Sequence, residues 1–128
     1  MFPYDPDINF FDEQCFQNLN TPYHDIAGAK VILGEFKNKI SIIHINLRSM
    51  NKNFEEFRDL LAELQFSFSI ICVTETWLTN TTFETDSNMH LTNYRGYHYE
   101  RNTGKKGGGI CVFVHETLKY KIRTELWL

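Results

Sequence analysis

Two polar residues close two largely apolar runs of the sequence, and their chemistry suits a divalent cation and a phosphate. Asn46 ends the run Ile42–Asn46, and Glu75 follows the run Ile70–Thr74. Carboxylate oxygens are ligands that hard cations such as Mg²⁺ prefer, and a neighbouring amide can orient a phosphate oxygen. The two residues are therefore candidate catalytic groups, with Glu75 as the metal ligand. The alternative is that both side chains satisfy backbone groups in the turns that follow the strands.

The stretch between these runs predicts a helix that would bring the two residues together. Lys39–Asn46 and Ile70–Thr74 are rich in β-branched residues, as strands are. Asn53 with Glu56 three residues later resembles a capping box, which predicts a helix start there. Apolar residues then recur at steps of three and four: Phe54, Phe57, Leu61 and Leu64. A strand, a helix and a second strand place the two strand ends side by side. The first strand has little polar alternation, so burial on both of its faces is expected.

The second half of the chain predicts antiparallel strands. Tyr97–Arg101 and Ile110–Val114 are expected to form a hairpin around a basic turn at 102–108. Alternation of Leu118, Tyr120 and Ile122 with basic residues predicts one more, half-buried strand. Residues 76–95 are polar and irregular, with 79–82 as the clearest loop. The fold class expected from these elements is α/β.

The composition is that of a globular chain with a patterned domain after a leader. The chain has 128 residues, of which 42% are hydrophobic, and residues 1–39 are broken by proline and polar residues. We therefore divide the chain into a poorly patterned leader, 1–39, and a domain, 40–128. No apolar run is long enough to cross a membrane and no secretory signal is visible, so an intracellular protein with no membrane partner is expected. Cys72 and Cys111 lie in apolar runs, where buried thiols are expected.

Positive charge gathers toward the C-terminus. Residues 95–128 hold seven Lys and Arg against three Glu, which suits a polyanion such as DNA, although a solvated surface carries such charge as well. The candidate nucleic-acid-binding residues are Arg48, Arg101, Lys105 and Lys106. The glycines 107–109 precede a strand rather than a helix, so they are expected to serve a turn or close packing and not a phosphate loop. Trp77 is expected to pack beneath Glu75, with base stacking as the alternative.

Four stretches in combination resemble the start of an endonuclease/exonuclease/phosphatase domain. They read HINLRSMNKNFEEFRDLL, FSIICVTETWL, YRGYHYERN and GGGICVFV, and they are most similar to the apurinic-type endonuclease of non-LTR (LINE-like) retrotransposons. The resemblance covers residues 40–123. It implies a four-layer α/β sandwich, in which two mixed β-sheets are flanked by helices. It also implies metal-dependent phosphodiester hydrolysis with Mg²⁺ or Mn²⁺, in which Asn46 organises the phosphate and Glu75 binds the metal.

The resemblance further implies DNA as the partner, a reverse transcriptase domain in the full-length parent, and the nucleus as a plausible location for the parent element. The family's later motifs, Asp-x-Asn and Ser-Asp-His, do not follow Glu75. Asp7–Asn9 has the first spelling but precedes the first strand. The chain is therefore expected to be the truncated N-terminal portion of such a domain, weakly active or inactive alone. The alternatives are a non-catalytic nucleic-acid-binding remnant, and a phosphatase or phospholipase of the same fold.

Overall fold

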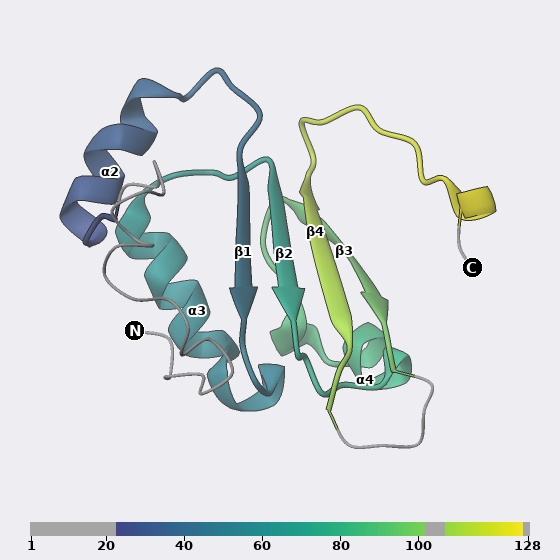
Figure 1. Ribbon diagram of the computed structural model, residues 1–128. Helices are drawn as coiled ribbons and strands as arrows, with labels where there is room; N and C mark the ends of the chain where they lie inside the picture. The colour runs from purple at the N-terminus through teal and green to yellow at the C-terminus, as the bar shows by residue number, and fades with distance from the viewer. Residues whose placement is uncertain (1–22, 102–106, 127–128) are drawn as a thin grey trace, which may run out of the picture.

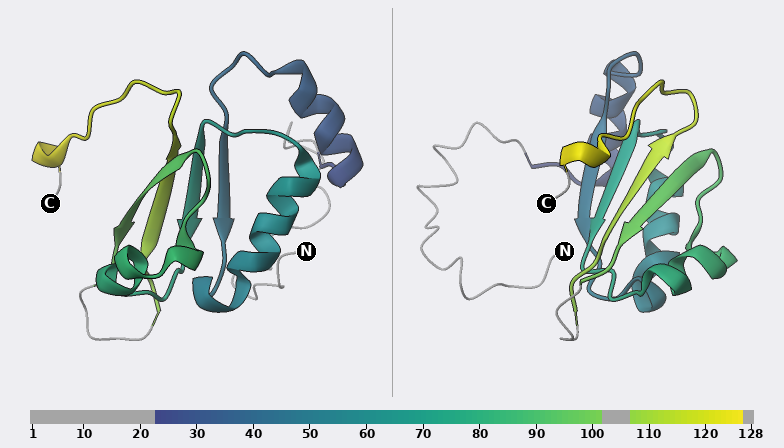
Figure 2. Two further views of the ribbon diagram at one scale, coloured as in Figure 1. Left: turned by 180° about the vertical axis from the view of Figure 1, so that it is seen from behind. Right: turned by 90° about the vertical axis from the view of Figure 1, so that its right-hand side faces the viewer.

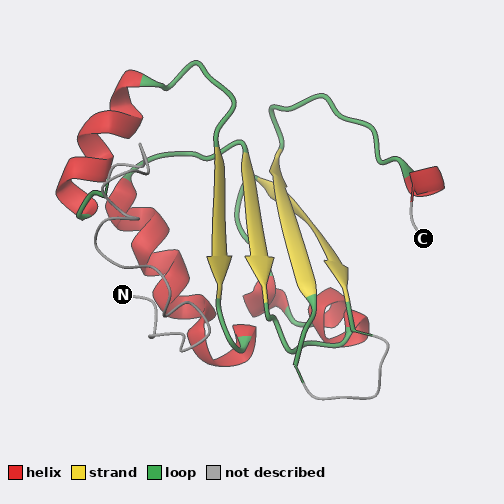
Figure 3. Cartoon of the chain, viewed as in Figure 1, coloured by secondary structure: helices red, strands yellow, loops and turns green. Residues whose placement is uncertain are grey.

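The computed structural model describes residues 23–101 and 107–126, which form an α/β domain built on one mixed sheet (Figures 1 and 3). Its four strands are β1 (Ile42–Asn46), β2 (Ile70–Thr74), β3 (Tyr94–Tyr99) and β4 (Ile110–His115). Its α-helices are α2 (Ile26–Glu35), α3 (Met50–Leu64) and α4 (Asn80–Thr85). Two short 3₁₀ turns complete it, η2 (Ser87–Met89) and η3 (Thr124–Leu126).

The sheet has the order β1-β2-β4-β3, and α3 connects its two parallel strands. β1 and β2 run parallel with Asn46 opposite Thr74, while β4 pairs antiparallel with both β2 and β3. The predicted strand–helix–strand unit and the predicted hairpin are thus both confirmed. Figure 2 shows α3 and α4 on the same side of the sheet, so, within residues 23–101 and 107–126, helices cover one face of the sheet and none covers the other.

Helix α3 confirms the predicted apolar period but begins earlier than predicted. The cap is Ser49, whose side chain accepts a hydrogen bond from Lys52 N at 3.3 Å. Asn53 is not the cap, because its Nδ2 donates to the carbonyl of Leu47 at 2.6 Å. The start of the helix is also fixed by hydrogen bonds from its first backbone N–H groups to the segment after β2. These contacts join residues far apart in the chain, which a local capping pattern does not report.

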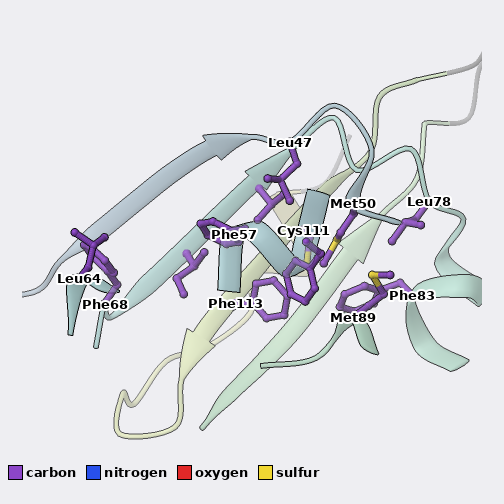
Figure 4. Close-up of a cluster of buried hydrophobic side chains, with 13 residues drawn as sticks. Leu47, Met50, Phe57, Leu64, Phe68, Leu78, Phe83, Met89, Cys111 and Phe113 are labelled. Carbon is purple, nitrogen blue, oxygen red and sulfur yellow. The ribbon is translucent and has the colours of Figure 1, made fainter. Parts of the chain in front are cut away.

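The core lies between α3, α4 and the covered face of the sheet (Figure 4). The Phe54 and Phe113 rings stack with centroids 6.0 Å apart, and the Phe83 ring lies 6.2 Å from that of Phe113. Gly96 in β3 makes this packing possible, because a Cβ there would lie 2.7 Å from Phe83 Cζ. The helices and the hairpin therefore share one core. Its buried members are Leu47, Met50, Phe54, Phe57, Leu64, Phe68, Ile71, Val73, Leu78, Phe83, Met89, Cys111 and Phe113.

The uncovered face of the sheet contradicts the prediction that the first strand is buried on both faces. β1 is an edge strand with alternating exposure, and Ile42 is 62% exposed. Ile110 of β4 is 48% exposed on the same face. Cys72 also lies on this face and is half-buried, whereas Cys111 faces the core, where burial raises the pKa of its thiol to about 12. We call this surface the open face, and it is apolar over much of its area.

Three segments differ from the sequence prediction. α2 lies within the supposed leader and packs on α3, and α4 occupies the region expected to be the clearest loop. The sequence does not predict α4, because this helix is short and has one buried apolar residue, Phe83, so it shows no helical repeat of apolar residues. Residues 118–122 form no strand, although the Tyr120 hydroxyl lies 2.6 Å from that of Tyr97. No helix in the described part of the chain is long and apolar enough to cross a membrane.

Candidate functional site

The ends of β1 and β2 meet as predicted and continue pairing beyond the strands. Leu47 N donates to the carbonyl of Thr74 at 3.1 Å, and Ser49 N donates to the carbonyl of Glu75 at 2.9 Å. Asn46 is exposed at the end of β1. No hydrogen bond joins the side chains of Asn46 and Glu75 among the described residues. The two predicted site residues are thus neighbours through their backbones.

The Glu75 carboxylate is held through one of its two oxygens. Oε2 accepts hydrogen bonds from the indole Nε1 of Trp77 at 2.9 Å and from the backbone N of Gly108 at 3.0 Å. These two bonds lower the pKa of Glu75, and the positive charges of Arg101 and Arg48 lower it further against an opposing effect of burial. Oε1 accepts no hydrogen bond from the described residues. The structure therefore orients an ionised carboxylate, and no described residue is hydrogen bonded to its second oxygen.

Unusual backbone conformations gather at this corner of the molecule. Four of the six described non-glycine residues with positive φ lie here: Arg48, Ser49, Glu75 and Trp77. Side chains disfavour this region because Cβ approaches the backbone, and such residues persist only where the surroundings hold them. The concentration of strained residues around one carboxylate is typical of a functional site rather than of an ordinary turn.

The glycine run 107–109 is one of the elements that hold this backbone. Trp77 N donates to the carbonyl of Gly108 at 2.9 Å, and Thr76 N donates to that of Gly109 at 3.2 Å. All three glycines have positive φ, between 74° and 94°. A Cβ on Gly109 would overlap Thr76 Oγ1. The expected role in close backbone packing is confirmed.

A chain of hydrogen bonds links three polar side chains, those of Thr76, His98 and Asn80, and was not predicted; we call it the relay. Thr76 is fully buried, and its Oγ1 lies 2.6 Å from Nε2 of His98. Nδ1 of His98 lies 2.8 Å from Oδ1 of Asn80, which also accepts from Glu100 N at 2.9 Å. An amide oxygen accepts only, so His98 carries its proton on Nδ1 and accepts from Thr76. His98 lies 22 positions from Thr76 and 18 positions from Asn80 in sequence, and no local pattern connects it to them.

A hollow of about 590 Å³ opens beside the Glu75 carboxylate. Trp77 and Arg101 line it together with Glu75, and the other lining residues are Leu78, Thr79, Glu100 and Gly107. Trp77 is 53% exposed, so the expectation that it packs beneath Glu75 is wrong. Its indole lies beside the carboxylate, with part of its surface in solvent.

The predicted basic residues are only partly brought together. Arg48 and Arg101 are exposed, and both are close enough to lower the pKa of Glu75. Lys105 and Lys106 lie outside the described residues, as do Asp7–Asn9. Across residues 23–101 and 107–126, no three His, Cys, Asp or Glu side chains gather as a metal cluster. Two carboxylates, Glu75 and Glu100, therefore line the hollow together with Arg101, and Arg48 is the other nearby guanidinium group.

Comparison with known proteins finds a partial structural likeness. No protein-family model and no curated protein sequence matches the chain. A solved structure of a variant of the 3′ phosphatase NExo from Neisseria, bound to a product DNA hairpin, matches with a TM-score of 0.48 and 17% identity. The match covers 59% of this chain and 27% of that chain. The likeness is to part of an endonuclease/exonuclease/phosphatase fold and concerns the fold alone.

The glycine run yields a prediction for stability, and a glycine in helix α2 serves as a control that should not be destabilised by the same substitution. Gly109→Ala should lower the free energy of unfolding by about 1–3 kcal/mol, because the new Cβ overlaps Thr76 and the backbone has positive φ. Gly34→Ala should instead leave stability unchanged or raise it by up to about 1 kcal/mol. Gly34 lies in α2, where an added Cβ would meet nothing within 4 Å and alanine favours the helix. Urea unfolding measures both, and equal effects would contradict the proposed packing.

The relay yields a prediction for pH. Burial lowers the pKa of His98 below its usual 6.5, against the opposing charge of Glu100. Between the two pKa values the unfolded chain binds a proton that the folded chain does not, so stability falls as the pH drops below 6.5 toward the folded-state pKa. Glu75, with its pKa lowered from 4.5, adds its own loss only at more acidic pH.

We therefore expect the urea midpoint of unfolding to decrease when the pH is lowered from about 7.5 to about 5.5. The decrease should be smaller in His98→Gln. The variant is less stable at both pH values, because glutamine cannot reproduce both hydrogen bonds of the ring. The quantity compared is therefore the change in each protein's urea midpoint between the two pH values, and not the midpoint at either pH. The same change in both proteins would show that His98 is protonated equally in the folded and unfolded chains.

Proposed function

We propose that this chain forms part of a metal-dependent phosphodiesterase site acting on DNA, with Glu75 as the ligand of the cation. The observation that carries the proposal is the state of the Glu75 carboxylate. It is ionised and oriented through Oε2, and Oε1 is left open beside the hollow that Arg101 lines. A carboxylate that only capped a turn would not require a strained backbone and an indole donor to orient it.

The residues present fit a weakly held hard cation. Mg²⁺ keeps several waters and takes as few as one or two protein carboxylates, so Glu75 is sufficient to hold it without a closed cage. The two nearby arginines reduce the affinity by their positive charge. When bound, the cation would neutralise charge on a phosphate and on its leaving oxygen. Mg²⁺ or Mn²⁺ is the cofactor we propose.

The remaining proposed roles belong to polar groups around the carboxylate. The Asn46 amide, at the neighbouring strand end, would donate a hydrogen bond to a phosphate oxygen. Arg48 and Arg101 would contact the DNA backbone, and Lys105 and Lys106 are proposed for the same role from the sequence. Both ring nitrogens of His98 are occupied in the relay, so this histidine is not available as a general base at the phosphate. We therefore propose weak activity for this chain alone.

The proposed fold is the sandwich of two mixed sheets, of which the observed sheet would be one. The open face supports this proposal, because exposed isoleucines on a sheet are costly in water and are usually covered. Ile42 and Ile110 lie on that face with Cys72 and Val112 between them in the sheet. A second sheet packed there would bury these side chains.

A second candidate is nucleic-acid binding without catalysis. The small number of carboxylates favours it, since the described residues gather no cluster of three metal-ligating side chains, whereas two arginines near Glu75 carry the positive charge that phosphate contacts require. Binding through phosphates weakens steeply with salt and needs no cation. Retention of DNA at low salt, lost at high salt and unchanged by chelation, would favour this candidate.

The metal proposal predicts cation binding that depends on Glu75. Titration with Mn²⁺, followed by electron paramagnetic resonance of the free ion, should detect a weak site in the wild-type chain. Glu75→Gln keeps the shape of the side chain but removes its charge, and should weaken the site about 10-fold or more. The matched control is Glu63→Gln, which makes the same change at an exposed position of α3. Equal affinity in all three proteins would contradict the proposal.

A nicking assay on supercoiled plasmid with Mg²⁺ tests the activity. We expect slow nicking at most, lost in Glu75→Ala and reduced in Asn46→Ala. Rapid nicking that Glu75→Ala abolishes would contradict the proposed weak activity while supporting the site. Nicking that persists in Glu75→Ala would show that the cleavage does not come from this site.

A further inference from the structure

Trp77 is a large aromatic side chain that the fold leaves in solvent at the edge of the site. It is 53% exposed and lines the hollow beside Glu75 and Arg101. Its neighbours in sequence, Thr76 and Leu78, are both buried. The chain thus turns a tryptophan outward between two core residues. An isolated exposed aromatic is ordinary on a protein surface, so the inference depends on how this one is held.

The Trp77 backbone is fixed in a conformation that is unfavourable for an aromatic residue. Its φ is +56°, in the left-handed region. Its backbone N donates to the carbonyl of Gly108 at 2.9 Å. A tryptophan that served only to cover apolar surface could lie in ordinary backbone geometry. The fold instead maintains strain at this residue, which points to a role for the direction of its side chain.

The indole ring is fixed as well, through its polar edge. Nε1 donates to Oε2 of Glu75 at 2.9 Å. Gly107 borders this contact, and a Cβ there would lie at van der Waals distance, 3.4 Å from Nε1 and 3.5 Å from Oε2. Both the backbone and the ring edge of Trp77 are therefore set before any ligand arrives. A ring that is already ordered loses little conformational entropy when something stacks on it.

The surroundings of the ring suit one kind of ligand. Arg101 lines the same hollow, and Arg48 lies near enough to Glu75 to lower the pKa of that carboxyl. A flat aromatic surface beside guanidinium groups matches a nucleotide, whose base stacks on the ring while its phosphate meets the cations. An acidic peptide would use the arginines but would gain little from a rigid indole.

We propose that Trp77 is a stacking platform for an unpaired nucleobase of single-stranded DNA, with the adjoining phosphate against Arg101. This inference rests on the proposed function for the nature of the ligand, but it requires neither a cation nor cleavage. The base is unpaired because a ring face can be covered only by a base that has left the helical stack. Stacking does not distinguish the four bases, so the platform recognises the presence of a base rather than its identity.

The test measures binding of a dye-labelled dT octamer by fluorescence anisotropy, at low salt and with EDTA. The comparison ligand is an octamer with the same phosphates and abasic sugars. We expect the dT octamer to bind wild-type protein about 5- to 150-fold more tightly than the abasic one, the range for stacking of one base. Equal affinity for the two ligands would overturn the proposal.

Two variants separate stacking from the hydrogen bond to Glu75. Trp77→Phe keeps an aromatic face and loses the N–H donor, whereas Trp77→Leu loses both. We expect Trp77→Phe to retain most of the preference for the dT octamer and Trp77→Leu to abolish it. Equal loss in both variants would assign Trp77 to positioning of Glu75 and overturn the stacking role. Circular dichroism confirms that both variants fold, which the exposure of the side chain favours.

A fluorescence readout reports on the ring itself. The chain has two tryptophans, so Trp127→Phe leaves Trp77 as the single indole emitter. The dT octamer should quench its emission and the abasic octamer should not, and emission unchanged by either would overturn the proposal. Mn²⁺ binding is measured on the same Trp127→Phe protein. Quenching without any Mn²⁺ binding would therefore reject the phosphodiesterase proposal and leave the stacking site intact.

Discussion

The candidate site depends on a three-residue segment, 75–77, that is hydrogen bonded from both sides. On one side, Ser49 N and Met50 N at the start of α3 donate to the carbonyls of Glu75 and Thr76. On the other, Thr76 N and Trp77 N donate to the carbonyls of the glycine run. The side chains of the segment then point alternately outward, inward and outward: Thr76 enters the core, and Glu75 and Trp77 face the hollow. One local constraint thus sets the start of a helix and the position of the carboxylate.

The same constraint explains why strained residues and glycines gather here. Residues 75–77 are hydrogen bonded to backbone on both sides, so few backbone conformations are available to them. Glu75 and Trp77 keep these hydrogen bonds while their φ angles lie in the left-handed region. The opposing segment can approach this closely at Gly109 only because it lacks a side chain there, since a Cβ would overlap Thr76 Oγ1. The relay from Thr76 through His98 to Asn80 anchors the segment from below, so α4 also contributes to its position.

The sequence was informative where one physical pattern dominated a segment. The period of Phe54 and Phe57 predicted α3, and the β-branched run before Glu75 predicted β2. The sequence could not predict that one face of β1 is exposed, because apolar residues in a strand do not show whether a neighbouring element covers them. At the site, the adjacency of the strand ends followed from topology, so the proximity of Asn46 and Glu75 could be predicted. The Thr76–His98–Asn80 relay arises from contacts between distant segments, and no local pattern encodes such contacts.

The charges around Glu75 connect the two proposals. Arg48 and Arg101 lower the pKa of the carboxyl, and the same positive potential opposes a cation at the open oxygen. A phosphate beside the arginines would cancel that potential, so the cation and the nucleotide should each bind more tightly when the other is present, by the same factor. A base stacked on Trp77 would hold its phosphate at this place. The site around Glu75 would then bind metal weakly in isolation and more strongly on DNA.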